Sequence, residues 1–248
     1  MVDFLRQVIV YDCGLTKMRF GNQGDGGYIM LVEPCYASSY LYSFGIGDDV
    51  SFELDVVRKF PWIKVKMFDP FITDLPENHD NFEFYKQGIS RDSLPLVGVE
   101  HNSILKMDIE YNEWEFINKI GEDVLQEFSQ LIIEFHFLHV THPDNLSPYF
   151  QKLYSGFTDG INQELFSRYH QCLHKINKFF YCYHVHANNS LPEIKLFDSK
   201  FPPLLEMSFI RKNLVNFSKP YRGEFPIPGL DYPNKPDRPD IVGCYPWR

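Results

Sequence analysis

The sequence predicts an α/β protein in which a mostly parallel sheet is covered by helices on both faces. Two observations predict this fold class. From residue 39 onward, short apolar runs alternate with segments whose apolar residues have helical spacing, and no repeat or low-complexity linker interrupts the alternation. A chain of 248 residues is also long enough for one such domain to bury its own core.

We therefore expect a single domain over residues 1–248. It would consist of an irregular N-terminal segment (1–37), an α/β core (38–212) and a proline-rich tail (213–248) that is extended from Lys219. Within the first segment, residues 21–27 are too rich in glycine for a helix and predict a loop, followed by the short apolar run Tyr28–Val32.

The apolar runs of the core predict five successive strands, at Tyr40–Phe44, Ile63–Phe68, Phe82–Tyr85, Ser103–Ile109 and Leu131–Phe137. The late runs Phe179–His186 and Leu204–Ile210 are expected as an antiparallel pair. Helices are predicted over Asp49–Phe60, Tyr111–Phe128 and Gly160–Lys178. Asp48 and Asp49 offer a cap at the start of the first helix, and Pro61 ends it.

Composition disfavours several classes of protein. A formal net charge of -9 argues against nucleic acid as a partner, because such binders carry basic faces. Five scattered cysteines without a CxxC pair indicate neither a disulfide framework nor a zinc site. No apolar run has the roughly 18 residues of a membrane span, and the N-terminus has no signal-peptide pattern. We expect a cytoplasmic protein, and the sequence gives no indication of its oligomeric state.

A nucleoside cofactor site is predicted at the first strand-to-helix turn, where Gly45-Ile46-Gly47 would let a ligand approach the backbone closely. Asp69 ends the next strand, 22 positions after Gly47, where a carboxylate can accept hydrogen bonds from ribose hydroxyls. The acidic pair Asp48-Asp49 would repel a dinucleotide pyrophosphate but tolerates the sulfonium cation of S-adenosylmethionine. NAD binding remains the alternative.

At this point several stretches resemble the FkbM-type methyltransferases and related methyltransferase-like proteins, over roughly residues 19 to 212. The matching stretches are Arg19–Gly21, Asp25–Tyr28, Tyr42–Glu53, Phe68–Pro70, Ile104–Glu110, Glu113-Trp114, Gln130–His136 and His184–Asn189. The resemblance implies the Rossmann-like class I methyltransferase fold with a seven-stranded sheet. It also implies S-adenosylmethionine as cofactor, in a family rich in O-methyltransferases that act on sugars or polyketides.

By position, the resemblance implies that Gly45, Gly47 and Asp69 hold the cofactor, joined by Asp108 at a later strand end. Ser90, with Gly88 and Ile89, would lie near the adenine. The loop that includes Asp25 and Tyr28 would lie near the methionine end or cover the site.

Acidic and imidazole side chains gather at the ends of two predicted strands. Asp108 follows the fourth strand, Glu134 and His136 are on the fifth, and His186 is on a late strand. Residues i and i+2 of a strand share a face, so Glu134 and His136 would project together. In one interpretation Asp108, Glu134 and His136 bind Mn²⁺ or Mg²⁺. In the other, His136 or His186 is a general base without a metal.

The function predicted from these residues is O-methylation of a hydroxyl on a sugar or glycan acceptor. Two alternatives stay open: an RNA ribose 2'-O-methyltransferase, and a catalytically degenerate methyltransferase fold that serves as an interaction module. Lys106 does not belong to an evident Lys-Asp-Lys-Glu set of the kind expected for the RNA enzyme.

Overall fold

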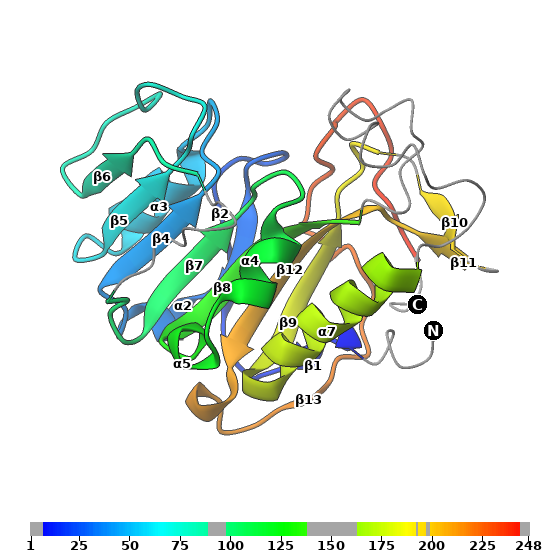
Figure 1. Cartoon of the computed structure of the whole chain (residues 1–248). Helices are drawn as coiled ribbons and strands as arrows, with labels where there is room; N and C mark the ends of the chain where they lie inside the picture. Colours follow the sequence, from blue (N-terminus) through cyan, green and yellow to red (C-terminus); the bar gives the residue numbers. More distant parts are fainter. Residues whose placement is uncertain (1–6, 89–97, 138–162, 192, 197–198, 244–248) are drawn as a thin grey trace.

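The computed structural model describes residues 7–88, 98–137, 163–191, 193–196 and 199–243. Its centre is a seven-stranded sheet with the strand order β6-β5-β4-β7-β8-β12-β9 (Figure 1). The strands span Tyr40–Phe44 (β4), Lys64–Phe68 (β5), Phe82–Tyr85 (β6), Ser103–Met107 (β7), Phe128–His136 (β8), Phe180–Ala187 (β9) and Leu204–Arg211 (β12). All seven strands predicted from the apolar runs are confirmed, with ends that differ by up to three residues.

Six strands of the sheet run parallel, and β12 is antiparallel to both of its neighbours, β8 and β9. This order, with one antiparallel strand between the last two parallel strands, is the Rossmann-like class I methyltransferase fold that the sequence predicts. The order reverses at β4, which pairs with β5 on one side and β7 on the other. Ligands of doubly wound sheets bind at such a switch point, beyond the carboxyl ends of the strands.

Helices cover both faces of the sheet. Helices α4 (Glu113–Lys119), α5 (Glu122–Leu125) and α7 (Gln163–Phe179) lie in front of it in Figure 1, and α2 (Val32–Cys35) and α3 (Ser51–Lys59) lie behind it. Alternate residues of each strand supply the two cores: Leu131, Ile133 and Phe135 face α4 and α7, whereas Ile132 packs with α3.

The prediction of one helix over Tyr111–Phe128 is wrong, because the chain forms two short helices and then enters β8 at Phe128. Ile120 leaves the helical conformation, and Gly121 has the extended backbone that starts α5. The ammonium of Lys175 on α7 donates to the carbonyl oxygens of Ile117 (2.8 Å) and Asn118 (3.1 Å), which stabilises the free end of α4.

The prediction that residues 1–37 are irregular is also wrong. The segment contains β1 (Tyr11–Asp12), helix α2 and the antiparallel hairpin β2 (Lys17–Phe20) and β3 (Tyr28–Leu31), whose turn is the predicted glycine-rich loop. The side chain of Gln130 on β8 holds β3 against the sheet by accepting from the amide of Leu31 (2.9 Å) and donating to its carbonyl (3.0 Å). The hydroxyl of Ser208 donates to the carbonyl of Ile29 at 2.8 Å.

The tail, which the sequence predicts to be extended, has bends and turns between residues 223 and 238, and it stays packed on the domain. Its strand β13 (Lys219–Pro220) pairs with β1, and a separate antiparallel pair, β10 (Ile194–Leu196) with β11 (Ser199–Phe201), precedes β12 in the core. Residues 225–240, which we call the C-terminal strap, then run past the carboxyl end of β9 (Figure 1). No helix in the described residues has the length and apolar character that crossing a membrane requires.

Gln130 gives a test of how the hairpin is held. We expect Gln130→Ala to lower the free energy of unfolding by about 2–4 kcal/mol, because both backbone groups of Leu31 and the hydroxyl of Tyr183 lose a buried partner. Urea unfolding measures the change. Gln126→Ala removes an exposed glutamine amide and is the matched control, with an expected change within about 0.5 kcal/mol. Equal losses in the two variants would contradict this account of the hairpin.

Candidate functional site

A cavity of about 590 Å³ opens at the switch point, within the size range of small-molecule sites. Its walls come from the turn after β4, the end of β5, the turn after β7 and the loop of the β2–β3 hairpin. Six residues predicted to bind a cofactor line it: Asp25, Tyr28, Gly45, Gly47, Asp69 and Asp108. Ser90, the remaining predicted cofactor residue, lies outside the described residues.

The two glycines of the first turn are required for different reasons. Gly45 has a φ of +77°, and a Cβ there would lie 1.6 Å from the carbonyl oxygen of Asp108, so the backbones of two strand ends touch at this point. Gly47 has a φ of +59°, and no atom lies within 4 Å of the place a Cβ would take. Gly47 therefore presents bare backbone to the cavity.

Asp69 shapes this turn. One carboxylate oxygen accepts from the amides of Ile46 and Gly47, both at 3.0 Å, and the other accepts from the amides of Phe71 (2.7 Å) and Ile72 (3.2 Å). Burial alone would raise the pKa of Asp69, but these amides hold it below its usual value. The carboxylate stays ionised and fixes the backbone on two sides of the cavity.

Acidic and imidazole residues form a row across four neighbouring strands. Glu206 on β12 is paired in register with Glu134 on one side and His186 on the other. On the parallel side, Lys106 pairs with Ile132, and continuing this register places Asp108 beside Glu134. The row Asp108, Glu134, Glu206 and His186 therefore runs from the cavity towards the edge of the sheet at β9, on the face that carries the β2–β3 hairpin.

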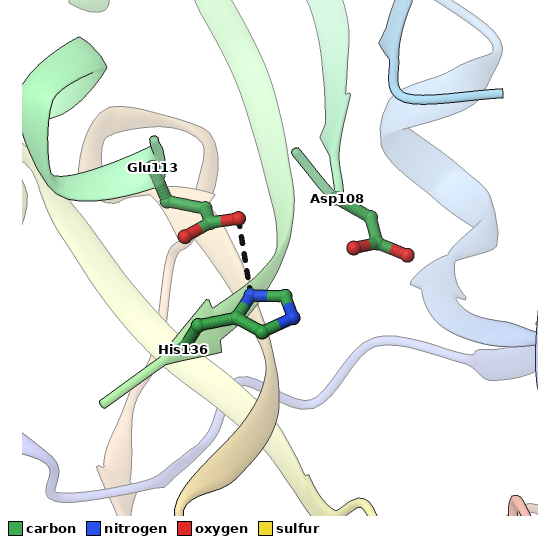
Figure 2. A group of neighbouring side chains, drawn as sticks. All are labelled: Asp108, Glu113 and His136. Atoms are coloured by element: carbon green, nitrogen blue, oxygen red, sulfur yellow. Dashed lines mark hydrogen bonds and ion pairs between the residues drawn. The ribbon is translucent and has the colours of Figure 1, made fainter. Parts of the chain in front are cut away.

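His136 lies between two carboxylates (Figure 2). Its Nδ1 is 3.1 Å from Oε1 of Glu113, and its Nε2 side faces Asp108 and is 3.5 Å from the exposed carboxylate of Glu110, which lines the cavity. Glu113 has no exposed side-chain surface and also accepts from the amide of Ile109 at 3.0 Å. It therefore fixes the orientation of the imidazole with Nε2 directed to the cavity side.

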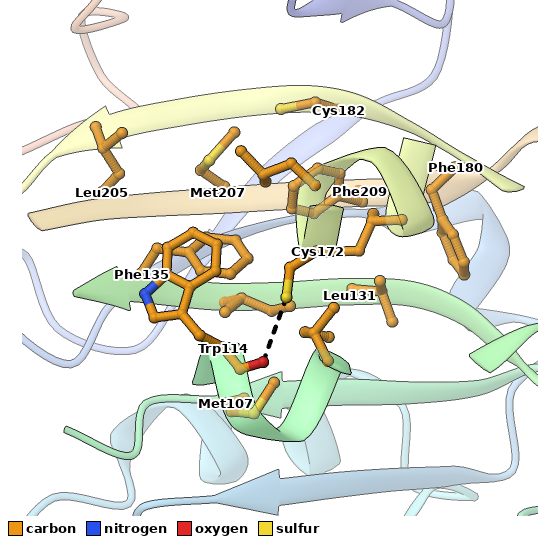
Figure 3. Packing of buried hydrophobic residues seen from close by; sticks show 14 of the residues in the cluster. Met107, Trp114, Leu131, Phe135, Cys172, Phe180, Cys182, Leu205, Met207 and Phe209 are labelled. Atoms are coloured by element: carbon orange, nitrogen blue, oxygen red, sulfur yellow. Dashed lines mark hydrogen bonds between the residues drawn. The ribbon is translucent and has the colours of Figure 1, made fainter. Parts of the chain in front are cut away.

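The packing of α4 places Glu113. Its neighbour Trp114 stacks on Phe135 with ring centroids 4.4 Å apart, and the indole nitrogen donates to the carbonyl of His136 at 2.6 Å. The thiol of Cys172 on α7 donates to the carbonyl of Trp114 (Figure 3). Sequence reasoning gave Glu113 no role, although its place in the first turn of the helix that follows Asp108 was a usable signal.

The cluster shifts the pKa values of its members. Burial would lower the pKa of His136, but the carboxylates of Glu113, Glu134 and Asp108 raise it to about 10. Both ring nitrogens are therefore protonated at neutral pH. Burial and the charge of Asp108 raise the pKa of Glu134 well above its usual value. The same two causes raise that of Tyr28, whose hydroxyl donates to Asp108 at 3.1 Å.

His186 is held on both sides. Its Nδ1 is 3.0 Å from Glu206, and its Nε2 is 3.3 Å from Asp240 of the C-terminal strap. Burial would lower the pKa of His186, but these carboxylates raise it to about 10. Its ring ties the strap to the sheet, whereas the Nε2 of His136 faces the cavity side.

Among the described residues, Asp108, Glu113 and His136 form a group whose potential metal-ligating atoms all lie within 4.8 Å of one another. Figure 2 shows the imidazole between the two carboxylates, with Glu113 at Nδ1 and Asp108 towards Nε2. An ion bound at Nε2 would therefore have Asp108 beside it and Glu113 behind the ring, where outer carboxylates commonly orient metal-bound histidines. The predicted ligand Glu134 is not part of this group; it lies next to Asp108 in the row, and its Oε1 accepts from the side-chain amide of Asn188 at 2.9 Å.

No protein-family model and no curated protein sequence matches the chain. Among solved structures, a variant of the 16S rRNA (adenine(1408)-N(1))-methyltransferase from Catenulisporales acidiphilia is 12% identical, covers 84% of this chain and 98% of its own, and has a TM-score of 0.36. The plantazolicin methyltransferase BpumL with SAH has 10% identity, 69% and 75% coverage and a TM-score of 0.37.

The N-terminal domain of EvdMO1, in the presence of SAH and D-fucose, has 9% identity, 72% and 78% coverage and a TM-score of 0.36. All three TM-scores are below 0.5. The fold assignment for this chain therefore depends on its own strand order and on the antiparallel β12.

The contact between Glu113 and His136 predicts how this histidine titrates. Because the pKa is raised in the folded state, His136 should keep its proton to about pH 10, and the stability it contributes should be complete below about pH 6.5 and lost as the pH rises through 10. In Glu113→Gln the pKa should fall by at least about one unit. Titration of the imidazole signals by NMR measures both values, and an unchanged pKa in Glu113→Gln would refute the assigned role of Glu113.

Proposed function

We propose that the protein is an S-adenosylmethionine-dependent methyltransferase that methylates a hydroxyl of a sugar or glycan. The observation that carries the proposal is that the candidate cofactor cavity adjoins the buried imidazole of His136. The cavity beside Gly45, Gly47 and Asp69 ends at Asp108 and Glu110, and His136 lies directly behind these carboxylates with Nε2 towards them.

The cavity suits this cofactor by shape and by charge. Gly47 leaves the backbone open to a ligand, and the acidic side chains Asp25, Asp48, Asp49 and Asp108 in the wall would attract the sulfonium and ammonium groups. The same side chains disfavour the pyrophosphate of NAD. When bound, adenosylmethionine supplies a methyl group activated by its sulfonium. Asp69 keeps the turn open for its nucleoside.

His136 would remove the proton from the attacking hydroxyl. Nε2 accepts this proton, while Nδ1 keeps its own proton and donates a hydrogen bond to the carboxylate of Glu113. A ring with a pKa of about 10 is protonated at pH 7 and cannot accept a second proton at once. Positive charge beside Asp108 offsets part of the carboxylate field that raises this pKa, so a bound cationic cofactor would favour loss of the Nε2 proton to solvent before the hydroxyl arrives.

The acidic surroundings favour an uncharged acceptor over RNA. In the described part of the site, Lys106 donates to the carbonyl of Gly45 at 2.6 Å and lies over the ring of Tyr28, so it is not directed at a phosphate. We propose a divalent cation, Mg²⁺ or Mn²⁺, only as a second mode of activation, held by Nε2 of His136 and the carboxylate of Asp108, which belong to one group of potential ligands.

Replacing the base tests this mechanism. We expect His136→Gln to lower the rate of methyl transfer at least about 100-fold, since general base catalysis typically contributes 10²–10⁴-fold. Binding of adenosylmethionine should persist, because its cavity is formed by other residues. Transfer of labelled methyl groups to a panel of sugars measures the rate, and calorimetry measures binding. His174→Gln alters an exposed histidine on α7 and is the control; a variant at position 136 as active as this control would exclude His136 as the base.

The rate should also depend on pH. Because only the neutral imidazole accepts a proton, and because carboxylates raise its pKa, the rate of methyl transfer should rise with pH above 7 and level off at or below pH 10, since bound adenosylmethionine offsets part of that rise in pKa. In Glu113→Gln the plateau should be reached at lower pH. A rate independent of pH over this range would contradict proton removal by His136.

The metal alternative has a separate test. If His136 acts as a free base, dialysis against EDTA leaves the rate unchanged, and added Mg²⁺ or Mn²⁺ does not increase it. Loss of activity in EDTA, restored by Mn²⁺ or Mg²⁺, would instead support the ion at Asp108 and His136.

A further inference from the structure

The wall of the cavity offers a single cationic side chain to the carboxylate of S-adenosylmethionine. The amino-acid end of this cofactor carries a carboxylate as well as an ammonium, and the many acidic side chains of the wall repel the carboxylate. Among the described residues that line the cavity, Lys106 is the only lysine or arginine. The carboxylate therefore needs either Lys106 or backbone amides as its partner.

The backbone amides of the first turn are already occupied. In many nucleotide-binding folds, the amides of a glycine turn and of the helix that follows it bind an anion. Here Asp69 accepts from the amides of Ile46 and Gly47, and Asp49 accepts from the amide of Ser51 at the start of α3. Carboxylates of the protein itself thus take the place of a bound anion, and Lys106 is the cationic donor that is left.

The register of the sheet places Lys106 beside this turn. Lys106 pairs with Ser43 on β4, and its ammonium donates to the carbonyl of Gly45 at 2.6 Å. The side chain is largely buried, but it lines the cavity, so a bound ligand can contact it. An ammonium has three N–H donors, and two remain after Gly45 is bound. No carboxylate of the described residues lies within ion-pair distance of this ammonium.

Lys106 and Asp108 form a pair of opposite charges on one face of the sheet. Asp108 directly follows β7 and extends its ladder by donating its amide to Phe44 at 3.0 Å, so residues 106 and 108 project to the same side. Tyr28 contacts both of them: the Lys106 ammonium lies 5.4 Å from the centroid of its ring, and its hydroxyl donates to Asp108 at 3.1 Å. Opposite charges held near each other without an ion pair complement the two charged groups of an α-amino acid.

We propose that Lys106 and Asp108 bind the amino-acid end of S-adenosylmethionine, with the Lys106 ammonium on the cofactor's carboxylate and Asp108 on its ammonium. Lys106 then selects the cofactor against its decarboxylated form, which has one more net positive charge and would otherwise suit the acidic wall better. The proposal rests on the proposed function. Because the Lys106 ammonium lies at Gly45, it acts on the cofactor and not on the acceptor.

Calorimetric titration with three ligands tests the role of Lys106 without an acceptor. The ligands are S-adenosylmethionine, its decarboxylated form, and 5'-methylthioadenosine, which lacks the amino-acid end. We expect wild type to bind S-adenosylmethionine about tenfold more tightly than the decarboxylated form, the scale of one hydrogen bond between charged groups. Lys106→Met should lose this preference, whereas its Kd for 5'-methylthioadenosine should stay within about twofold of the wild-type value.

Lys66→Met is the matched control and should keep the preference. Lys66 also lies on a strand of the sheet with its ammonium over tyrosine rings, but it pairs with Glu100 and does not line the cavity. Equal weakening of all three ligands in Lys106→Met would indicate a purely structural lysine and overturn the proposal.

Wild type alone can also overturn it, even if Lys106→Met fails to fold. Wild type that binds S-adenosylmethionine no more tightly than the decarboxylated form would refute the role of Lys106 and leave the proposed function standing. Binding of none of the three ligands would refute both proposals.

Discussion

Excess negative charge at one edge of the sheet is the constraint on which the rest of the site depends. The fold brings the ends of β7 and β8 together with the start of β12, so Asp108, Glu134 and Glu206 become neighbours on one face. Carboxylates this close cannot all be ionised in a buried site without compensation. The protein compensates with two protonated histidines, a raised pKa at Glu134 and the amide nitrogens of Asn188 and Asn234.

This balance connects the cofactor cavity to the proposed chemistry. His136 owes its raised pKa to Glu113, Glu134 and Asp108, and Asp108 also lines the cavity. A cation bound in the cavity changes the field at His136 without touching it. Under the proposed mechanism, a cationic cofactor would lower the pKa of His136, so that its Nε2 proton passes to solvent before a hydroxyl reaches this nitrogen.

Much of the cavity wall could be predicted because the carboxyl ends of parallel strands lie together. Gly45, Asp69 and Asp108 each follow an apolar run, and the two-residue period of a strand predicts that Glu134 and His136 share a face. Glu206 escaped prediction because β12 is antiparallel, so its acidic residue stands near the beginning of an apolar run and not at its end. The role of Glu113 depends on how α4 packs through Trp114, which spacing alone does not reveal.

The N-terminal hairpin and the strap could not be predicted for a different reason. The strands β2 and β3 have four residues each, too few for a clear alternation, and their pairing depends on buried contacts of Gln130 and Ser208 far along the chain. Strap residues Asp231, Asn234 and Asp240 lie in a proline-rich segment without periodicity. Their positions follow from side-chain anchors such as Asn189, and only the folded chain brings these together.

The most direct test of the central claim is calorimetric titration of the protein with S-adenosylmethionine, with NAD as the comparison ligand. We expect a dissociation constant in the micromolar range for adenosylmethionine, or about -8 kcal/mol for 1 μM, and no detectable binding of NAD. Asp69→Ala should weaken the adenosylmethionine complex, because the turn at Gly47 loses its carboxylate anchor. Binding of NAD in its place, or of neither ligand, would contradict the account.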